Sequence, residues 1–298
     1  MLLAFYAIYS KLANNTSLDL NKFLIILKES GVFTIKTVSL LAFLSILNWF
    51  LEILKWKLLV GTITKIDLKS ATEQSLGSLT SSVFTPNRIG EYAAKLMYFP
   101  KKNRKSIIAL NFLGNMMQMS VTTFFGIVAL LGFQIQYQIE LLNPNTITFG
   151  FVALGLLGFM IFRFRNRQFK IKGIAFSTLK RFFRQIPKLI YSKGLLFSMA
   201  RYFIFSFQFY LLLYSFNVGL GYLDSMMIIS SMYFLASIIP SIFIFDVVIK
   251  GGVATYLFAI AGVSTISTLS IISLMWLLNF AFPAIIGSYF VINFKRPE

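Results

Sequence analysis

Apolar runs separated by short polar segments make up most of this chain of 298 residues. A helix needs about 20 apolar residues to cross a bilayer. Runs of about that length or longer predict spanning helices at about 32–54, 106–133, 195–218 and 265–292. A shorter run at about 146–162 predicts a fifth span, and the apolar helix at about 1–12 spans only if the native chain starts further upstream. The pattern therefore predicts an all-α integral membrane protein with about six spanning helices.

Two further stretches contain helices of half that length on either side of a proline. The stretch 68–99 is rich in Ser and Thr, and Thr85 with Pro86 supplies the capping hydroxyl and first-turn proline that start a helix. The stretch 225–261 breaks at Pro240. Because proline inside a regular helix costs about 3 kcal/mol, we expect two re-entrant helical hairpins with the prolines at their tips inside the membrane. Hydroxyls of the first hairpin either line a wet groove or satisfy its opened backbone.

Loop charge assigns the sides of the membrane. The loop 101–105 is strongly basic, and the segment 163–193 has ten Lys or Arg and no Asp or Glu, whereas 134–145 has no Lys or Arg. Basic loops stay in the cytoplasm, which places the first two segments and the C-terminal Lys295 and Arg296 on the inner side of a bacterial cytoplasmic membrane. The segment 163–193 is also amphipathic, so it either lies on anionic headgroups or forms a plain basic loop.

These directions predict an inverted-topology repeat within one transmembrane domain, 1–298. Residues 1–133 and 146–292 contain the same order of span, hairpin and span, and every direction is reversed in the second half. In transporters with such repeats, broken helices meet near the bilayer midplane and hold the substrate. We therefore expect the binding residues on the two hairpins.

Composition excludes several kinds of chemistry. Hydrophobic residues make up 57% of the chain and charged residues 13%, a balance too apolar for a water-facing surface. Cys and His are absent, which excludes disulfides, thiol and imidazole chemistry, and structural zinc. The ten carboxylates are scattered, with no two within four residues, so we expect neither a metal nor a cofactor. The net charge of +18 follows from the basic inner loops and does not require nucleic acid.

Arg88, Glu91 and Lys95 share one face of the half-helix after Pro86, at spacings of three and four. Burying an arginine in a membrane costs at least about 2.5–3.5 kcal/mol. One interpretation is structural, with Glu91 paired to Arg88 or to Lys95. The other is functional: Arg88 and Lys95 bind a lipid phosphate near the positive end of the half-helix dipole, and Glu91 orients them. The two interpretations are compatible.

The second half has a counterpart in Asp246 and Lys250, which lie four residues apart on a predicted helix. A structural interpretation is that the two side chains neutralise each other. A functional interpretation is that Lys250 supplies a second phosphate-binding cation near the midplane and that Asp246 orients it.

Small residues and one charged pair complete the candidates. Close approach of a helix or a lipid to the backbone is expected at Gly90, Gly251 and Gly252. Glu52 lies near the inner end of an apolar helix, one turn before a Trp. We expect it to snorkel toward the interface together with Lys55.

Four segments carry a family resemblance. The first half contains LNWFLEILKWKLL (47–59) and LTSSVFTPNRIGEYAAKLMYF (79–99), and the second contains IIPSIFIFDVVIKGG (238–252) and LMWLLNFAFPAIIG (274–287). Together they resemble the flippase-like family related to the transmembrane region of lysylphosphatidylglycerol synthase. Lys250 stands roughly where members of that family often have arginine, and the aminoacyl-transferring soluble domain of the synthase is missing. The resemblance implies lipid translocation without lysyl transfer.

The favoured function is therefore that of a lipid translocase, which moves an anionic phospholipid or a lipid-linked precursor between leaflets. Its expected partners are membrane lipids, further copies of the chain, or a separate membrane enzyme. One alternative is a membrane enzyme that acts on a lipid-linked substrate with Glu91 as its base. Another is an assembly partner of such an enzyme. The lack of clustered metal ligands in the sequence disfavours the enzyme.

Overall fold

The computed structural model describes residues 28, 30–83, 85, 89–139, 170–171, 174–239 and 246–294. Its regular structure is helical, as predicted, apart from a two-residue antiparallel pairing of β1 (Lys170–Ile171) with β2 (Ile174–Ala175). The predicted helices at about 1–12 and 146–162 lie outside the described residues. Outside them too lie three candidate residues, Pro86, Arg88 and Pro240.

Four helical stretches of the described residues are long and apolar enough to cross a membrane. They are α3 (Ile35–Val60), the 3₁₀ turn η1 (Lys101–Asn103) with α6 (Arg104–Tyr137), α9 (Lys188–Ser215), and α12 (Thr265–Trp276), which continues through the π-helical turn η3 (Leu277–Ala281) into α13 (Phe282–Ile292). They coincide with four of the six predicted spans. Large apolar side chains on their outer faces are exposed, among them Phe43, Phe124, Leu196 and Ile286, which suits helices that face lipid.

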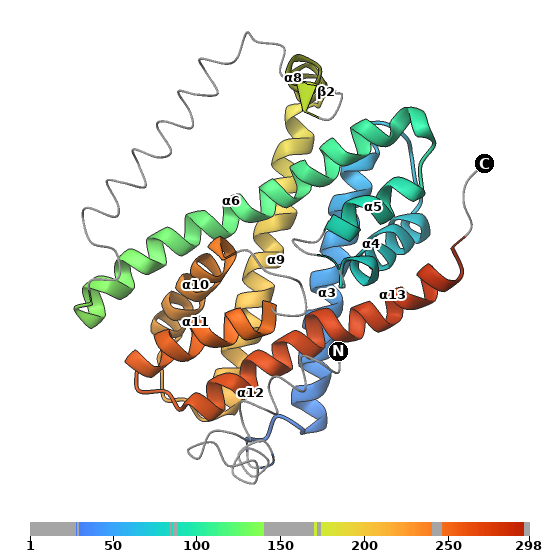
Figure 1. Ribbon diagram of the computed structural model, residues 1–298. Helices are drawn as coiled ribbons and strands as arrows, with labels where there is room; N and C mark the ends of the chain where they lie inside the picture. The colour runs from blue at the N-terminus through green and yellow to red at the C-terminus, as the bar shows by residue number, and fades with distance from the viewer. Residues whose placement is uncertain are drawn as a thin grey trace.

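Two pairs of short helices lie among the long ones (Figure 1). α4 (Leu68–Ser82) packs on α5 (Ile89–Met97), and α10 (Tyr222–Ile238) packs on α11 (Asp246–Ile260). These pairs occupy the two stretches in which the sequence predicts hairpins. α4 begins after Asp67, whose carboxylate accepts a 2.8 Å hydrogen bond from Ser70 N. Hydrogen bonding by Ser70 lowers the pKa of that exposed carboxyl.

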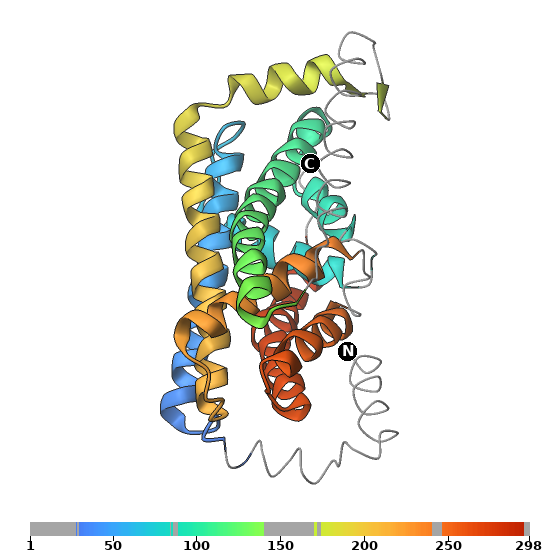
Figure 2. The same ribbon diagram turned by 90° about the vertical axis from the view of Figure 1, so that its left-hand side faces the viewer.

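The helices of the two halves of the chain are interleaved (Figures 1 and 2). α3 lies against α9 and runs in the opposite direction, α10 packs on α6, and α13 packs on α4. Glycines bring the last two contacts close. A Cβ at Gly126 of α6 would lie 2.2 Å from the Cβ of Phe234, and a Cβ at Gly287 of α13 would lie 2.2 Å from the carbonyl oxygen of Leu76. A larger residue at either position would force these helices apart.

One end of the molecule is strongly basic. The C-terminal end of α3 and the N-terminal ends of α6 and α9 lie there, and α8 (Phe176–Gln185) lies across it (Figure 2). Phe182, Phe183 and Ile186 pack onto the hydrophobic cluster that contains Trp56 and Ile107. The described basic residues of this end include Lys57, Lys65, Lys101, Lys102, Arg104, Lys105, Arg181, Arg184, Lys188 and Lys193. The described segments that the sequence assigns to the cytoplasm therefore meet at a single end.

Candidate functional site

A cavity of about 310 Å³ lies among the helices, and side chains from both halves of the chain line it. Helices α3, α4, α5 and α6 contribute from the first half, and α9, α10, α11 and η3 from the second. Its charged lining residues are Glu52, Lys55, Glu91, Lys95, Arg201 and Lys250. Among the described lining residues, four basic side chains thus face two carboxylates, and this described set remains positive even if Lys250 is left out.

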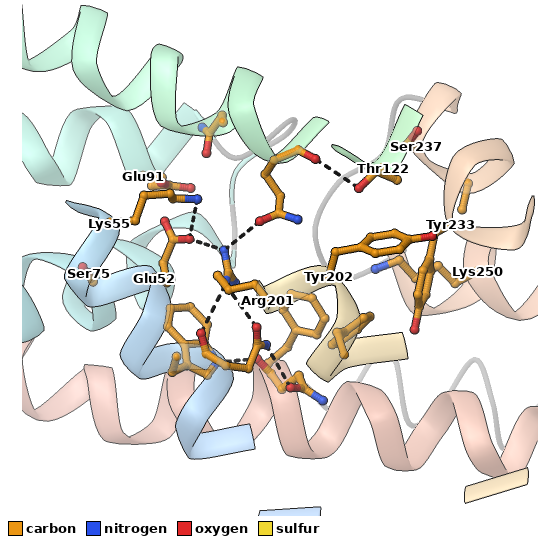
Figure 3. A pocket seen from close by; sticks show the side chains of 18 of the residues that line it. Glu52, Lys55, Ser75, Glu91, Thr122, Arg201, Tyr202, Tyr233, Ser237 and Lys250 are labelled. Atoms are coloured by element: carbon orange, nitrogen blue, oxygen red, sulfur yellow. Dashed lines mark hydrogen bonds and ion pairs between the residues drawn. The ribbon is translucent and has the colours of Figure 1, made fainter. Parts of the chain in front are cut away.

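Arg201 of α9 lies at the centre of the polar contacts of this cavity (Figure 3). Its Nε donates to the carbonyl oxygen and to Oδ1 of Asn48, at 3.2 and 3.1 Å. Its Nη1 forms an ion pair with Glu52 and donates to Gln118 Oε1 at 3.4 Å. Nη2 makes no hydrogen bond within the described part of the chain. One edge of the guanidinium is therefore open to a ligand.

Glu52 and Lys55 of α3 face the cavity rather than the interface (Figure 3). Lys55 Nζ lies 2.8 Å from Glu52 Oε2, and the Lys55 side chain is only 2% exposed. The predicted snorkelling of this pair is therefore wrong. The physical reason is that α3 continues to Val60, beyond its predicted end at about 54. Asn48, Glu52 and Lys55, at spacings of four and three, consequently share its inward face.

Glu91 and Lys95 of α5 form the second ion pair, with Lys95 Nζ 2.9 Å from Glu91 Oε1. The Lys95 ammonium also donates to Asn111 Oδ1 at 2.7 Å and lies 4.1 Å from the centroid of the Trp56 ring. Of the two partners expected for Glu91, the structure shows Lys95, whereas Arg88 lies outside the described residues. An ammonium has three donors, and these contacts leave Lys95 little capacity for the lipid phosphate that the sequence assigns to it.

Lys250 lines the cavity on the far side of Arg201 from Glu52, close to Tyr233 (Figure 3). Its Nζ lies 5.0 Å from the centroid of the Phe280 ring. Asp246 is the first residue of α11, and its side chain lies outside the described part of the structure. The expected pairing of Asp246 with Lys250 stays a prediction.

Thr85 and Gly90 join the start of α5 to the end of α4. The Thr85 hydroxyl donates to the carbonyl oxygen of the last residue of α4 at 3.1 Å and accepts from Gly90 N at 2.8 Å. A Cβ at Gly90 would lie 2.2 Å from the carbonyl oxygen of Ser81, so the backbones approach closely here. At Gly251 the nearest described atom would be at 3.4 Å, an ordinary contact, and at Gly252 no described atom would lie within 4 Å. A close helix approach at these two glycines is absent from the described residues, and the alternative approach of a lipid stays a prediction.

The hydroxyl groups of α4 divide between backbone and cavity. Ser78 donates to the carbonyl oxygen of Ser75 at 3.0 Å, and Thr80 donates to that of Ala284 in α13 at 2.7 Å. Ser75 itself lines the cavity, and its buried Oγ has no hydrogen-bond partner among the described residues. The same holds for the hydroxyl of Tyr233. These two groups can hydrogen-bond a ligand without breaking a bond that the described residues make.

Asn279, at the centre of η3, connects three helices. Its Oδ1 accepts from Asn48 Nδ2 at 3.3 Å, and its Nδ2 donates to Gln208 Oε1 at 2.8 Å. Its carbonyl oxygen accepts from Trp49 Nε1 at 2.9 Å. Since Asn48 also accepts from Arg201, the network fixes the guanidinium relative to α3 and η3. Short π-helical turns are frequent at functional sites.

Sequence reasoning missed Arg201, although a signal was present. Arg201 is the only charged residue between Lys193 and Asp224, and a charge inside an apolar span marks a functional site by default. A second signal was Asn48 and Glu52, the two polar residues of the otherwise apolar stretch 46–54, four positions apart on one helix. Both signals lie on long helices, whereas the prediction had placed the binding residues on the hairpins.

Comparison of the chain with known protein families, with curated proteins and with solved structures found no match. The function is therefore argued from the geometry and charge of the cavity.

Proposed function

We propose that the protein is a lipid translocase that moves an anionic phospholipid or an anionic lipid-linked precursor between the leaflets of a bacterial cytoplasmic membrane. The observation that carries the proposal is the excess of cations over carboxylates in a cavity among helices that include four long and apolar enough to cross a membrane. Each buried cation is costly in a membrane and persists only with a partner or a role. With Lys250 set aside, the described lining still has three cations, Lys55, Lys95 and Arg201, against two carboxylates, Glu52 and Glu91, and in this proposal a bound phosphate supplies the further negative charge.

The phosphate site centres on Arg201 and Lys55. The Nη2 group of Arg201 is open, and guanidinium groups bind phosphate through two parallel hydrogen bonds. Lys55, whose side chain is only 2% exposed, pairs with Glu52 beside this group and contributes its positive charge to the site. The buried hydroxyls of Ser75 and Tyr233 lie on the lining as further donors. Lys95 stays in its own cluster and serves the site as a structural residue.

The packing of the helices supports the inverted repeat that such a carrier uses. If α3, α4, α5 and α6 correspond to α9, α10, α11 and α12–α13, each contact between halves has its counterpart. α4 packs on α13 as α10 packs on α6, and α3 packs on its own counterpart α9. An arrangement of this kind follows from a two-fold axis in the membrane plane. In this proposal the two short-helix pairs are the re-entrant hairpins, and alternating access moves one half against the other.

Topology can be tested with single cysteines, since the natural chain contains none. Asn103 in η1 and Gln138 after α6 lie at opposite ends of one long helix. Cysteines at these two positions should be labelled from opposite sides of the membrane, Asn103 from the cytoplasm. Labelling of both from one side would rule out the proposed topology.

Transport itself can be tested in vesicles of zwitterionic lipid that contain the purified protein and a fluorescent phosphatidylglycerol. The wild type should move the label between leaflets faster than protein-free vesicles do. Arg201→Gln should slow the movement by at least about tenfold, because loss of charge-assisted bonds of about 1.5–3 kcal/mol has that effect on a rate or an affinity. Arg201→Lys should retain part of the rate, since it keeps the charge and loses the planar fork.

Lys193→Gln is the matched control, because Lys193 is an exposed cation on the same helix and lies outside the cavity. Its rate should equal that of the wild type. An Arg201→Gln protein that moves lipid at the wild-type rate would contradict the proposed site. A wild type that leaves the label in place would contradict translocation itself.

A further inference from the structure

The Glu52 carboxylate holds together two cations that belong to different halves of the chain. Lys55 lies on α3 with Glu52 itself, at 2.8 Å, and Arg201 reaches Glu52 from α9 (Figure 3). The Glu52 and Arg201 side chains keep 15% and 17% of their surface exposed. Glu52 is therefore within reach of an entering ligand at the place where the cations are.

The other carboxylate of the cavity is arranged differently. Glu91 pairs with Lys95 inside α5, and both side chains are at most 5% exposed. Lys95 is further engaged by Asn111 and by the ring of Trp56. Exchange of Glu91 for a ligand would require this whole cluster to open, whereas Glu52 can leave Arg201 without losing its second cation.

A carrier faces two charge states of one site. With an anionic lipid bound, Arg201 is neutralised by the phosphate. Without the lipid, the same guanidinium must remain in the low-dielectric interior while the protein returns, and an uncompensated buried charge makes that step slow. A carboxylate of the protein that pairs with Arg201 only in the empty state lowers this barrier.

We propose that Glu52 takes the place of the lipid phosphate on Arg201 in the unloaded protein and gives it up when the lipid binds. Lys55, one turn along α3, keeps Glu52 neutralised after the exchange, so no carboxylate is left unpaired. Asn48 and Gln118 hold the guanidinium in position in both states. The inference rests on the proposed translocase function and adds the return of the empty carrier to it.

Glu52→Gln removes the competing charge and conserves the shape of the side chain. Two measurements follow from the proposal. Short-chain phosphatidylglycerol in detergent should bind the variant more tightly, by about three- to tenfold, the usual range for loss of one competing contact. Movement of labelled phosphatidylglycerol across vesicles of purely zwitterionic lipid, which requires the empty carrier to return, should slow by a similar or larger factor.

A second vesicle preparation separates the steps. When unlabelled phosphatidylglycerol is present in both leaflets, the carrier can return loaded, and Glu52→Gln should exchange lipid at a rate close to that of the wild type. Glu52→Asp keeps a carboxylate and should preserve the wild-type ratio of net movement to exchange. This variant is the control for a folding defect caused by substitution at position 52. Glu73→Gln is a control, because Glu73 lies on α4 outside the cavity lining.

The outcomes are distinguishable. Weaker binding by Glu52→Gln, or equal slowing of net movement and exchange, would overturn the role of Glu52 while leaving translocation intact. A wild type that shows neither binding nor movement would instead overturn the proposed function and this inference with it.

Discussion

Two ion-pair clusters share one cavity and differ in how completely their cations are partnered. The Lys95 ammonium is held by Glu91, Asn111 and the Trp56 ring. The Arg201 guanidinium leaves Nη2 without a described partner and joins α9 to α3. The first cluster ties α5 to its neighbours, and the second spans the two halves of the chain. Residue type alone does not distinguish a structural cation from a ligand-binding one. The distinction depends on how many N–H donors of the cation have no hydrogen-bond partner among the described residues.

The largest effect that this comparison predicts is on stability and comes from Lys95. Lys95→Met should lower the free energy of unfolding by about 3–5 kcal/mol, the usual loss when a buried pair is broken from one side. The double variant with Glu91→Gln should recover much of it, because the carboxylate that Lys95 neutralises is removed together with Lys95. Titration with a denaturing detergent measures the free energy of unfolding of the single and of the double variant. A loss below about 1 kcal/mol for the single variant would show that the cluster is not structural.

A smaller effect is expected at Asn111, which is 2% exposed. Asn111→Leu removes the oxygen that accepts from Lys95 at 2.7 Å. Hydrogen bonds to charged groups contribute about 1.5–3 kcal/mol, and stability should fall by that amount. Lipid movement, measured at a temperature where the variant is folded, should be unchanged. Slower movement with normal stability would place Asn111, and Lys95 with it, in the binding site.

The second cluster should respond in the opposite way. Arg201→Gln should cost less stability than Lys95→Met, about 1–3 kcal/mol, because Lys55 continues to neutralise Glu52. The same substitution should slow lipid movement by at least about tenfold. Unfolding curves and transport rates from the same preparation test the contrast. A stability loss as large as that of Lys95→Met would erase the distinction between the clusters.

The smallest effect on stability is expected at Ser75. Its buried hydroxyl has no partner among the described residues, so Ser75→Ala should change the free energy of unfolding by less than about 0.5 kcal/mol. If the hydroxyl donates to the ligand, affinity for short-chain phosphatidylglycerol should fall by about two- to tenfold. Ser78→Ala is the control, because the Ser78 hydroxyl bonds to the backbone of α4. Equal affinities for the two variants would remove Ser75 from the ligand site.

Much of the fold could be predicted because spans in a membrane are defined by length and apolarity. The final span was predicted at about 265–292 and extends from Thr265 to Ile292. The break inside it could not be predicted, because nothing in the letters LLNFA indicates a π turn. That turn is tied to α3 by Trp49, which lies 230 positions from Asn279. A contact between residues so far apart in the chain cannot be predicted from the residues next to either of them.

The site was partly predictable because some of its contacts lie within a single helix. Glu91 and Lys95 lie on one helix at a spacing of four, so their pairing follows from sequence. The acceptor that completes the Lys95 cluster, Asn111, comes from another helix, and Arg201 meets Glu52 across 149 positions. Which cation has donors to spare depends on these distant partners, and a motif cannot show it.

The packing of α13 on α4 has a consequence for biosynthesis. The Thr80 hydroxyl bonds to a carbonyl oxygen 204 residues later in the chain. At about 5–20 residues per second, a ribosome needs roughly 10–40 s to make that interval. During this time the hydroxyl-rich α4 lies in or near the membrane without the helix that covers it. The first half therefore reaches its native packing only when the last span has been inserted, and the cavity forms at the end of synthesis rather than half by half.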